Sequence, residues 1–185
     1  MGDIWNNEIL VLILEQAFGV LALICTVVSM QLKSKKPLMV LQTASEAFIV
    51  AQYLVKNATT GALMASVSFI RDLIFTKYGK KRAPFWILLI IYAAMTVLTI
   101  ISWNGPLSLL PFVGSIIYAF TLWYGEVRWI RLGNAVGNSP YLIYTFLTGN
   151  WALFVMTLLE VISSVIGFIR IDMLGKKKKA KKNKR

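Results

Sequence analysis

Histidine is absent from the 185 residues of the chain, and cysteine occurs once, as Cys25. One cysteine excludes a disulfide within the chain, and the two shortages together exclude a metal site built from cysteine and histidine. The chain also lacks the glycine-rich phosphate loop of nucleotide-binding proteins and the G-x-S-x-G turn of serine hydrolases. We therefore expect no enzyme, no cofactor and no bound metal. Cys25 is interpreted as a small buried packing residue.

Apolar residues are what the chain has in excess. They make up 57% of the sequence, against about 45–50% in a soluble domain, and the mean hydropathy is +0.67. They occur in blocks close to the roughly 20 residues that a helix needs to cross a bilayer. A soluble bundle is excluded, because the blocks are apolar on all sides and leave too little polar surface to face water. The lipid bilayer is therefore the expected surroundings of the chain.

Seven such blocks are separated by short breaks rich in glycine, proline, asparagine or basic residues, which are typical helix ends. The sequence thus predicts one all-α membrane domain over residues 1–175, in which neighbouring helices run antiparallel. The first block lacks the basic start and the cleavage site of a signal peptide, so we expect it to be a retained span. The seven predicted spans are residues 8–30, 38–55, 60–77, 84–103, 107–124, 129–147 and 150–170.

Basic residues mark every second connection. They occur at 33–36, 77–82 and 128–131 and again after the last span, whereas the connections between these carry one lysine, Lys56, or none. Lysine and arginine collect on the cytoplasmic side of a membrane. The pattern predicts a multi-pass protein of the cytoplasmic membrane with its N-terminus outside the cell and its C-terminus inside.

The last ten residues, 176–185, form a basic tail that supplies eight positive charges of the net charge of +12. A tail of this composition anchors the topology and meets anionic lipid headgroups. It has neither the interleaved aromatic residues nor the folded module that nucleic-acid binding requires. We expect lipid, and no nucleic acid, as its partner.

The two halves of the sequence resemble each other. Residues 53–75 and 143–168 both contain a tyrosine, a polar turn with glycine, an Ala-Leu step and an apolar helix with polar residues near its centre. Together with the alternating topology, this predicts a parallel repeat, an arrangement known in transporters. The repeat comprises a triplet over residues 8–77, a linker helix over 84–103 that faces lipid, and a second triplet over 107–170.

Four stretches are similar to the YgjV family of bacterial inner-membrane proteins: TTGALMASVSFIRDLIF (59–75), LLPFVGSIIYAFTLW (109–123), RLGNAVGNSPYLIYTFLTGNWA (131–152) and EVISSVIGFIR (160–170). The three-plus-one-plus-three plan, with the polar end of span one, SMQLKSKKPL (29–38), resembles the PQ-loop superfamily. That superfamily includes the SWEET sugar transporters and the PnuC vitamin transporters, although its Pro-Gln pair is missing here. The resemblance implies the bacterial inner membrane, a SWEET-like fold and a polar metabolite such as a vitamin, nucleoside or sugar.

Ionisable side chains at bilayer depth cost about 2.5–3.5 kcal/mol each on insertion scales and are usually functional. Glu46 and Glu160 lie near the centres of their spans, and Arg71 and Asp72 lie past the middle of span three. Arg71 can pair with either glutamate, since buried charges are normally paired. Arg71 and Asp72 are neighbours in the chain, so we expect them to face different directions and not to pair. Glu15 lies nearer the interface and is less informative.

Small and polar residues continue these positions along one face of five helices, at spacings of three and four. On this pattern we predict a polar cavity with a solute site formed by Glu46, Ser68, Asn134, Asn138, Glu160 and Ser164. The alternative for the small residues is close helix packing, which the GNAVG stretch of Gly133 and Gly137 favours. Pro140 either breaks its helix beside the site or only kinks it.

The sequence thus predicts a small-solute carrier, either a facilitator or an ion-coupled one, that alternates access around this site. Assembly into a dimer or trimer is compatible with the pattern. The alternative is a non-transporting membrane protein: a scaffold, a partner-binding subunit or a sensor. Polar stripes paired between the two triplets favour the carrier, whereas purely structural ion pairs without a cavity favour the alternative.

Overall fold

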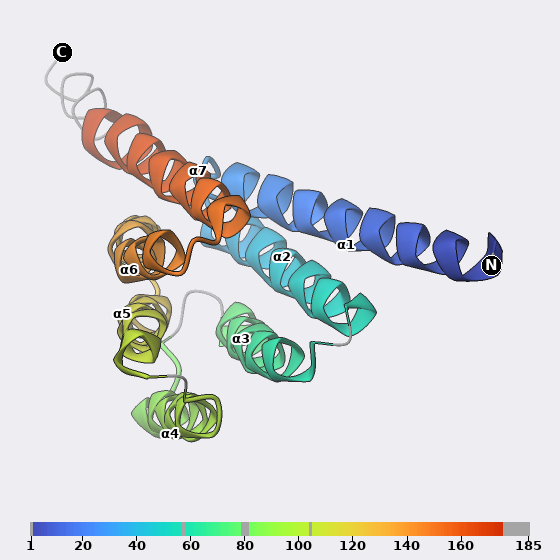
Figure 1. The fold of residues 1–185 in the computed structure, drawn as a ribbon. Helices are drawn as coiled ribbons and strands as arrows, with labels where there is room; N and C mark the ends of the chain where they lie inside the picture. Colours follow the sequence, from blue (N-terminus) through green and yellow to red (C-terminus); the bar gives the residue numbers. More distant parts are fainter. Residues whose placement is uncertain (1, 57, 79–81, 104, 176–185) are drawn as a thin grey trace, which may run out of the picture.

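The computed structural model describes residues 2–56, 58–78, 82–103 and 105–175, and this part of the chain is helical throughout (Figure 1). The basic tail 176–185 and the loop residues Lys80 and Lys81 lie outside the described residues. A short 3-10 helix, η1 (Pro106–Ser108), precedes α5, and a π-helix, η2 (Phe168–Met173), continues α7. The seven α-helices are α1 (Gly2–Ser29), α2 (Lys35–Val55), α3 (Thr59–Tyr78), α4 (Phe85–Ile101), α5 (Leu109–Tyr124), α6 (Val127–Leu147) and α7 (Trp151–Gly167).

Each predicted span corresponds to one observed helix. Helix α1 begins six residues before the predicted start at residue 8, and the other helix ends lie within three residues of the prediction. The breaks coincide with glycines that adopt positive φ: Gly125 (82°) caps α5, and Gly149 (69°) separates α6 from α7. Residues with a Cβ rarely adopt this backbone conformation, so these glycines end the helices.

Four segments are long and apolar enough to cross a membrane, judged by length and composition: Glu8–Ser29, Lys35–Val55, Pro106–Tyr124 and Leu153–Met173. Helix α4 is apolar but shorter, with 17 residues, and α3 and α6 carry charged and amide side chains. Large apolar side chains are exposed on all seven helices, as expected of surfaces that contact lipid tails. Spans three, four and six remain predictions.

Consecutive helices run antiparallel between two ends of the bundle. At one end, Arg131 at the start of α6 binds backbone carbonyls just after α1 and also Asp172 in η2. At the same end, the Trp123 indole at the end of α5 donates to the carbonyl of Ala83, 2.8 Å away, before α4. We call this the basic end, because it gathers Lys33, Lys35, Lys36, Arg82, Arg128, Arg131 and Arg170.

At the opposite end, α1 and α2 are joined by an ion pair between Lys56 and Glu15, whose atoms lie 2.8 Å apart. The end of α4 meets the first half of α3 there, where Ser102 contacts Met64. Helices α1, α3, α5 and α7 therefore all end at the basic end, and α2, α4 and α6 start there. The N-terminal half of α1 extends beyond its neighbours (Figure 1), and residues 8–14 are exposed.

Helix α2 packs against both α1 and α3, and α6 packs against both α5 and α7 (Figure 1). The two groups meet where α7 contacts α1 and where α3 contacts α5, and α4 contacts α3 and α5. Apolar side chains from α2 to α6 form a buried core among these helices. Helix α4 contributes Ile87, Leu88, Ile91 and Met95 to it, so it buries one face against protein and exposes the others.

Glycine sets the close approach of α5 and α6. A Cβ added at Gly114 would lie 2.1 Å from the carbonyl oxygen of Gly137, and one added at Gly133 would lie 2.1 Å from the Thr121 hydroxyl. Real Cβ atoms do not come this close, so the two helices can touch only where no side chain intervenes. The packing interpretation of Gly133 and Gly137 is therefore confirmed.

Helix α6 runs without a break from Val127 to Leu147 with Pro140 inside it. Proline has no backbone N–H, so the carbonyl of Val136, four residues earlier, loses its helical partner. The helix nevertheless continues on both sides. Of the two alternatives, an unwound helix beside the site is therefore not what the structure shows.

Candidate functional site

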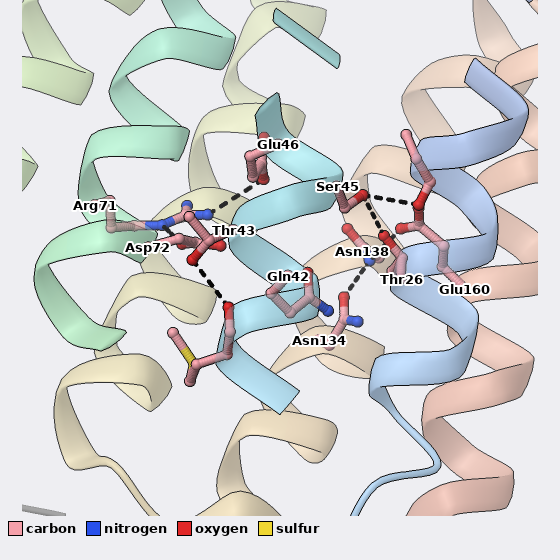
Figure 2. Close-up of polar contacts among 12 residues, drawn as sticks. Thr26, Gln42, Thr43, Ser45, Glu46, Arg71, Asp72, Asn134, Asn138 and Glu160 are labelled. Atoms are coloured by element: carbon pink, nitrogen blue, oxygen red, sulfur yellow. Dashed lines mark hydrogen bonds and ion pairs between the residues drawn. The ribbon is translucent and has the colours of Figure 1, made fainter. Parts of the chain in front are cut away.

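Polar side chains from five helices, α2, α3, α5, α6 and α7, gather inside the bundle, on both sides of α2 (Figure 2). We call this cluster the polar centre. On one side of α2, Arg71 and Asp72 of α3 lie near Glu46; on the other side, the α6 amides lie near Glu160 of α7 (Figure 2). Its members are Glu46, Arg71, Asp72, Tyr118, Asn134, Asn138, Glu160 and Ser164.

The first half of the polar centre is an ion-paired group around Arg71. The guanidinium of this residue, 3% exposed, lies 2.7 Å from the Asp72 carboxylate and 3.5 Å from that of Glu46. It also lies over the ring of Tyr118 on α5, 5.0 Å from its centroid. Arg71 therefore links α2, α3 and α5 through one buried cation.

The expectation that Arg71 and Asp72 do not pair was wrong. Their Cα–Cβ bonds do point to different sides of α3, but the long arginine side chain lets its Nε reach back to the neighbouring carboxylate. Of the two glutamates considered as partners, the structure pairs Arg71 with Glu46. Ser68, the predicted site residue on α3, lies one turn before Asp72 and is half-buried.

The second half of the polar centre joins α6 to α7. The Asn138 amide donates to the side-chain oxygen of Asn134, one turn away, and to a carboxylate oxygen of Glu160 at 3.3 Å. Since α6 and α7 are antiparallel, the next turn toward the basic end places Asn134 at the level of Ser164. Glu160 forms no ion pair with another described residue.

Four buried polar atoms lack a hydrogen-bond partner among the described residues, and all belong to the polar centre: Asp72 Oδ2, the Tyr118 hydroxyl, Asn134 Nδ2 and Ser164 Oγ. Leaving such a group unpaired costs about 1–3 kcal/mol, so native proteins contain few of them. Two of them, on Asp72 and Tyr118, lie in the half around Arg71, and two, on Asn134 and Ser164, lie in the half formed by α6 and α7.

Burial varies along the three helices of the polar centre. On α6, Asn134 is buried, whereas Asn138, Tyr141 and Tyr144 are half-buried. On α7, Ser164 is buried and Glu160 is half-buried. On α2, Gln42 is buried, whereas Glu46 keeps 18% of its side chain exposed. Glu46, Asn138 and Glu160 are therefore less buried than the residues one turn nearer the basic end, and Thr145 and Thr157 beyond them are buried again.

Two tyrosines, Tyr53 of α2 and Tyr141 of α6, lie near the glutamates of the polar centre. Tyr141 interacts electrostatically with Tyr53, Glu160, Tyr144 and Glu46, and the rings of Tyr141 and Tyr144 stack with centroids 6.0 Å apart. Glu46 and Glu160 also interact with each other. Tyr141 is thus within electrostatic range of both glutamates, and Tyr53 of Glu46.

Arg131 closes the bundle at the basic end. Its fully buried guanidinium donates to the carbonyl of Met30 at 2.7 Å and to that of Leu32, and it lies 2.5 Å from the Asp172 carboxylate. The end of a helix leaves carbonyls unpaired, and a guanidinium can serve several acceptors at once. We call this group the Arg131 closure.

A second contact layer lies beneath the Arg131 closure. Gln31 donates to the backbone oxygen and the hydroxyl of Ser163, at 2.9 and 3.0 Å, and the Ser163 hydroxyl donates to the carbonyl of Val27. Gly167 has no room for a side chain, since an added Cβ would lie 2.4 Å from the carbonyl oxygen of Met30. Together, the two layers hold α1 against α7 near the basic end.

Sequence reasoning missed the role of Arg131. It counted this residue among the loop charges that set orientation, but the side chain is fully buried within the bundle. One signal could have identified it, because position 131 falls inside the predicted span 129–147. Asp172, Tyr118 and Ser163 were also missed, and nothing local in the sequence distinguishes them.

An all-helical bundle with apolar outer surfaces and an ionisable interior is the architecture of an integral membrane protein. The chain belongs to the family Imp-YgjV, described as bacterial inner membrane protein, whose family model matches residues 13–174. This agrees with the YgjV resemblance and with location in the bacterial inner membrane. No curated protein and no solved structure matches the chain.

Proposed function

We propose that the protein is a seven-span carrier for a small polar solute, which it binds at the polar centre and releases on alternate sides of the membrane. The observation that carries the proposal is the group of four unpaired buried polar atoms, which α3, α5, α6 and α7 contribute together. A rigid scaffold gains nothing from leaving these groups unpaired. A binding site does, because its guest supplies the missing partners.

The contacts between the helices support a parallel repeat of SWEET-like plan. Helices α2 and α6 begin at Lys35 and Val127, and α3 and α7 begin at Thr59 and Trp151, so both pairs differ by 92 positions. The same correspondence of helices relates the α1–α7 contact to the contact of α5 with α3. Such a pairing of contacts is what two similar triplets related by a twofold axis would produce.

The closest approaches inside each triplet also correspond. In the first triplet, the Ser45 hydroxyl of α2 donates to the carbonyl of Ala22 on α1 at 2.8 Å. The positions 92 residues later are Gly114 and Gly137, where α5 and α6 touch. The two crossings use different residue types at equivalent positions, which is consistent with an ancient repeat whose identity has faded.

The distribution of charge supports an N-out, C-in orientation, because the basic end would then face the cytoplasm. The Arg131 closure would then lie on the cytoplasmic side of the polar centre. Labelling of single cysteines at Lys77 and Ser102, in a Cys25→Ala background, tests this. Reaction of Ser102→Cys only from the cytoplasm would reverse the orientation.

The polar metabolites implied by the family resemblance, vitamins, nucleosides and sugars, are the first solutes to test. Purified protein would be screened by thermal shift, since a ligand at 100 times its Kd adds about 2.7 kcal/mol to stability. Uptake of each stabilising solute would then be measured in proteoliposomes. We expect uptake to be lost in Asn138→Ala and kept in the matched variant Thr96→Val, which lies on the exposed face of α4. If no solute stabilises the protein or crosses the membrane, the proposal fails.

The alternative function is a non-transporting scaffold, partner-binding subunit or sensor. One observation favours it: Arg71, Asp72 and Glu46 pair with one another, so half of the polar centre is a structural ion-pair group. A surface hollow between α3 and α4, lined by Ile74, Trp86 and other apolar residues, could then hold a partner helix. A protein that binds no solute but co-purifies with one membrane partner would support this alternative.

A further inference from the structure

We infer that the solute bound at the polar centre is a small organic ammonium ion that also carries a hydrogen-bonding oxygen. The inference rests on the proposed carrier function and adds the chemical class of its solute. Three independent features of the site lead to it: the unbalanced charge at Glu160, the neighbouring tyrosines, and the unpaired donors one turn deeper.

The charges of the polar centre do not balance. It contains three acidic side chains, Glu46, Asp72 and Glu160, and one cation, Arg71, which is already bound to the first two. The partner of Glu160 is an uncharged amide, that of Asn138. A carboxylate held within a bilayer needs a positive partner or a proton. An anionic solute would be repelled, and a neutral one would leave Glu160 to be neutralised by a proton.

Neighbouring basic residues cannot supply that partner. Lys56 is engaged with Glu15 at the opposite end, and Arg131 is engaged with Asp172 and two backbone carbonyls at the basic end. The structure thus contains an acceptor for one positive charge on the side of the polar centre away from Arg71. Glu160 and Asn138, which would meet the cation, are half-buried.

An organic cation fits the surroundings better than a metal ion does. Calcium takes six to eight oxygen ligands, and the described residues contain no group of three acidic or other metal-binding side chains that could hold a metal. Tyr141 instead lies within electrostatic range of both glutamates and Tyr53 within range of Glu46, and the Tyr144 ring stacks on Tyr141. Tyrosine rings attract cations through their electron-rich faces, and such rings recognise quaternary ammonium groups.

The deeper part of the site requires a hydrogen-bonding oxygen from the solute. The Asn134 amide and the Ser164 hydroxyl, both buried and without a partner, lie one helical turn from Glu160 toward the basic end. An amide N–H can only donate, so its missing partner is an acceptor. An ammonium group near Glu160 and the tyrosines, with a hydroxyl or carbonyl oxygen reaching Asn134 and Ser164, would satisfy all these groups.

The test uses three ammonium probes and an uncharged probe of similar shape for each. The pairs are ethanolamine with ethylene glycol, choline with 3,3-dimethylbutan-1-ol, and acetylcholine with 3,3-dimethylbutyl acetate. Binding to the full chain in lipid nanodiscs would be measured by calorimetry. We expect at least one ammonium probe to bind at least tenfold more tightly than its uncharged match, and Glu160→Gln to remove that preference. Glu15→Gln, which removes a carboxylate outside the polar centre, is the matched control and should change nothing.

Two further variants keep the test decisive. Glu160→Asp retains the charge and should keep the preference for the ammonium probe, even if Glu160→Gln folds poorly. Asn134→Leu removes the amide donor, so choline should bind at least threefold more weakly. The preference for ammonium probes over uncharged ones should remain. Equal binding of charged and uncharged probes, or charge preference that survives Glu160→Gln, would overturn the inference.

The failure of this inference can be told from failure of the carrier proposal. If a neutral or anionic metabolite binds in an Asn138-dependent way and no ammonium probe does, the charge assignment is wrong and the carrier stands. If none of the probes or metabolites binds or is transported, both are wrong.

Discussion

The Arg131 closure and the polar centre are built from similar side chains but differ in how completely they are bonded. The Arg131 guanidinium donates hydrogen bonds to two backbone carbonyls just after α1 and to the Asp172 carboxylate. The polar centre also contains an arginine, carboxylates and amides, yet four of its buried polar atoms have no partner among the described residues. A fully bonded buried network holds its helices in one arrangement, whereas the unpaired groups of the polar centre are the ones that the proposed solute would bond.

The two regions also differ in position. The Arg131 closure joins α1, α6 and η2 at the basic end, with the Arg131 side chain fully buried, whereas Glu46, Asn138 and Glu160 are half-buried near the middle of their helices. Substitutions in the closure should therefore act on stability. Substitutions at Glu160 and Asn138 should act on binding, and the following predictions test this division.

The largest expected loss of stability is in Arg131→Met. The substitution leaves the Asp172 carboxylate and two backbone carbonyls without their partner, and breaking a buried pair costs roughly 3–5 kcal/mol in soluble proteins. Thermal unfolding in detergent should show a clear fall in Tm. The control is Arg128→Met, where an exposed pair with Glu126 is lost and the cost should stay below about 1 kcal/mol. Equal effects would mean that the closure is not a structural unit.

A smaller loss is expected in Gly114→Ala. The new Cβ would meet the backbone of Gly137, and a backbone oxygen cannot rotate away, so α5 and α6 must separate. Overpacking of this kind typically costs 1–3 kcal/mol. The control is Val136→Ala, an exposed position of α6. Unchanged stability in Gly114→Ala would show that the α5–α6 contact is looser than described.

Glu160→Gln is expected to preserve stability or raise it slightly. Glu160 has no cationic partner among the described residues, so the change removes a costly charge and leaves no cation unpaired. Arg71→Gln should by contrast destabilise, because it leaves Asp72 and Glu46 uncompensated. Tm values of the two variants provide the comparison. A fall in Tm for Glu160→Gln as large as that for Arg71→Gln would show that Glu160, like Arg71, has a structural role.

The smallest effect is expected in Lys56→Met at the opposite end. Its ammonium lies 2.8 Å from Glu15, but the lysine side chain is 58% exposed, and exposed ion pairs contribute about 0–1 kcal/mol. The free energy of unfolding would be measured at low and at high salt, and at each salt concentration the variant should differ little from the unsubstituted protein. A loss comparable to that of Arg131→Met would show that this end is held as tightly as the basic end.

The sequence by itself determined the helices and the depth of the polar residues. Apolar blocks of limited length can only be satisfied as helices in lipid, and glycines with positive φ end them, so the helix order could be predicted closely. The helical repeat then placed Glu46, Asn138 and Glu160 near the middle of their helices. Both inferences depend on local chemistry that acts within one helix.

Only the tertiary structure decided which polar groups are bonded to one another. Arg71 reaches back to Asp72, against the expectation from their adjacent positions, and Arg131 lies inside the bundle, where loop counting had placed it in solvent. Asn134 and Ser164 come level with each other only because α6 and α7 are antiparallel and in contact. Long side chains can reach partners over several ångströms, so their bonding depends on which helices pack together. That packing is set by the shape of whole helix surfaces, including the glycine contact between α5 and α6, and no single stretch of the sequence encodes it.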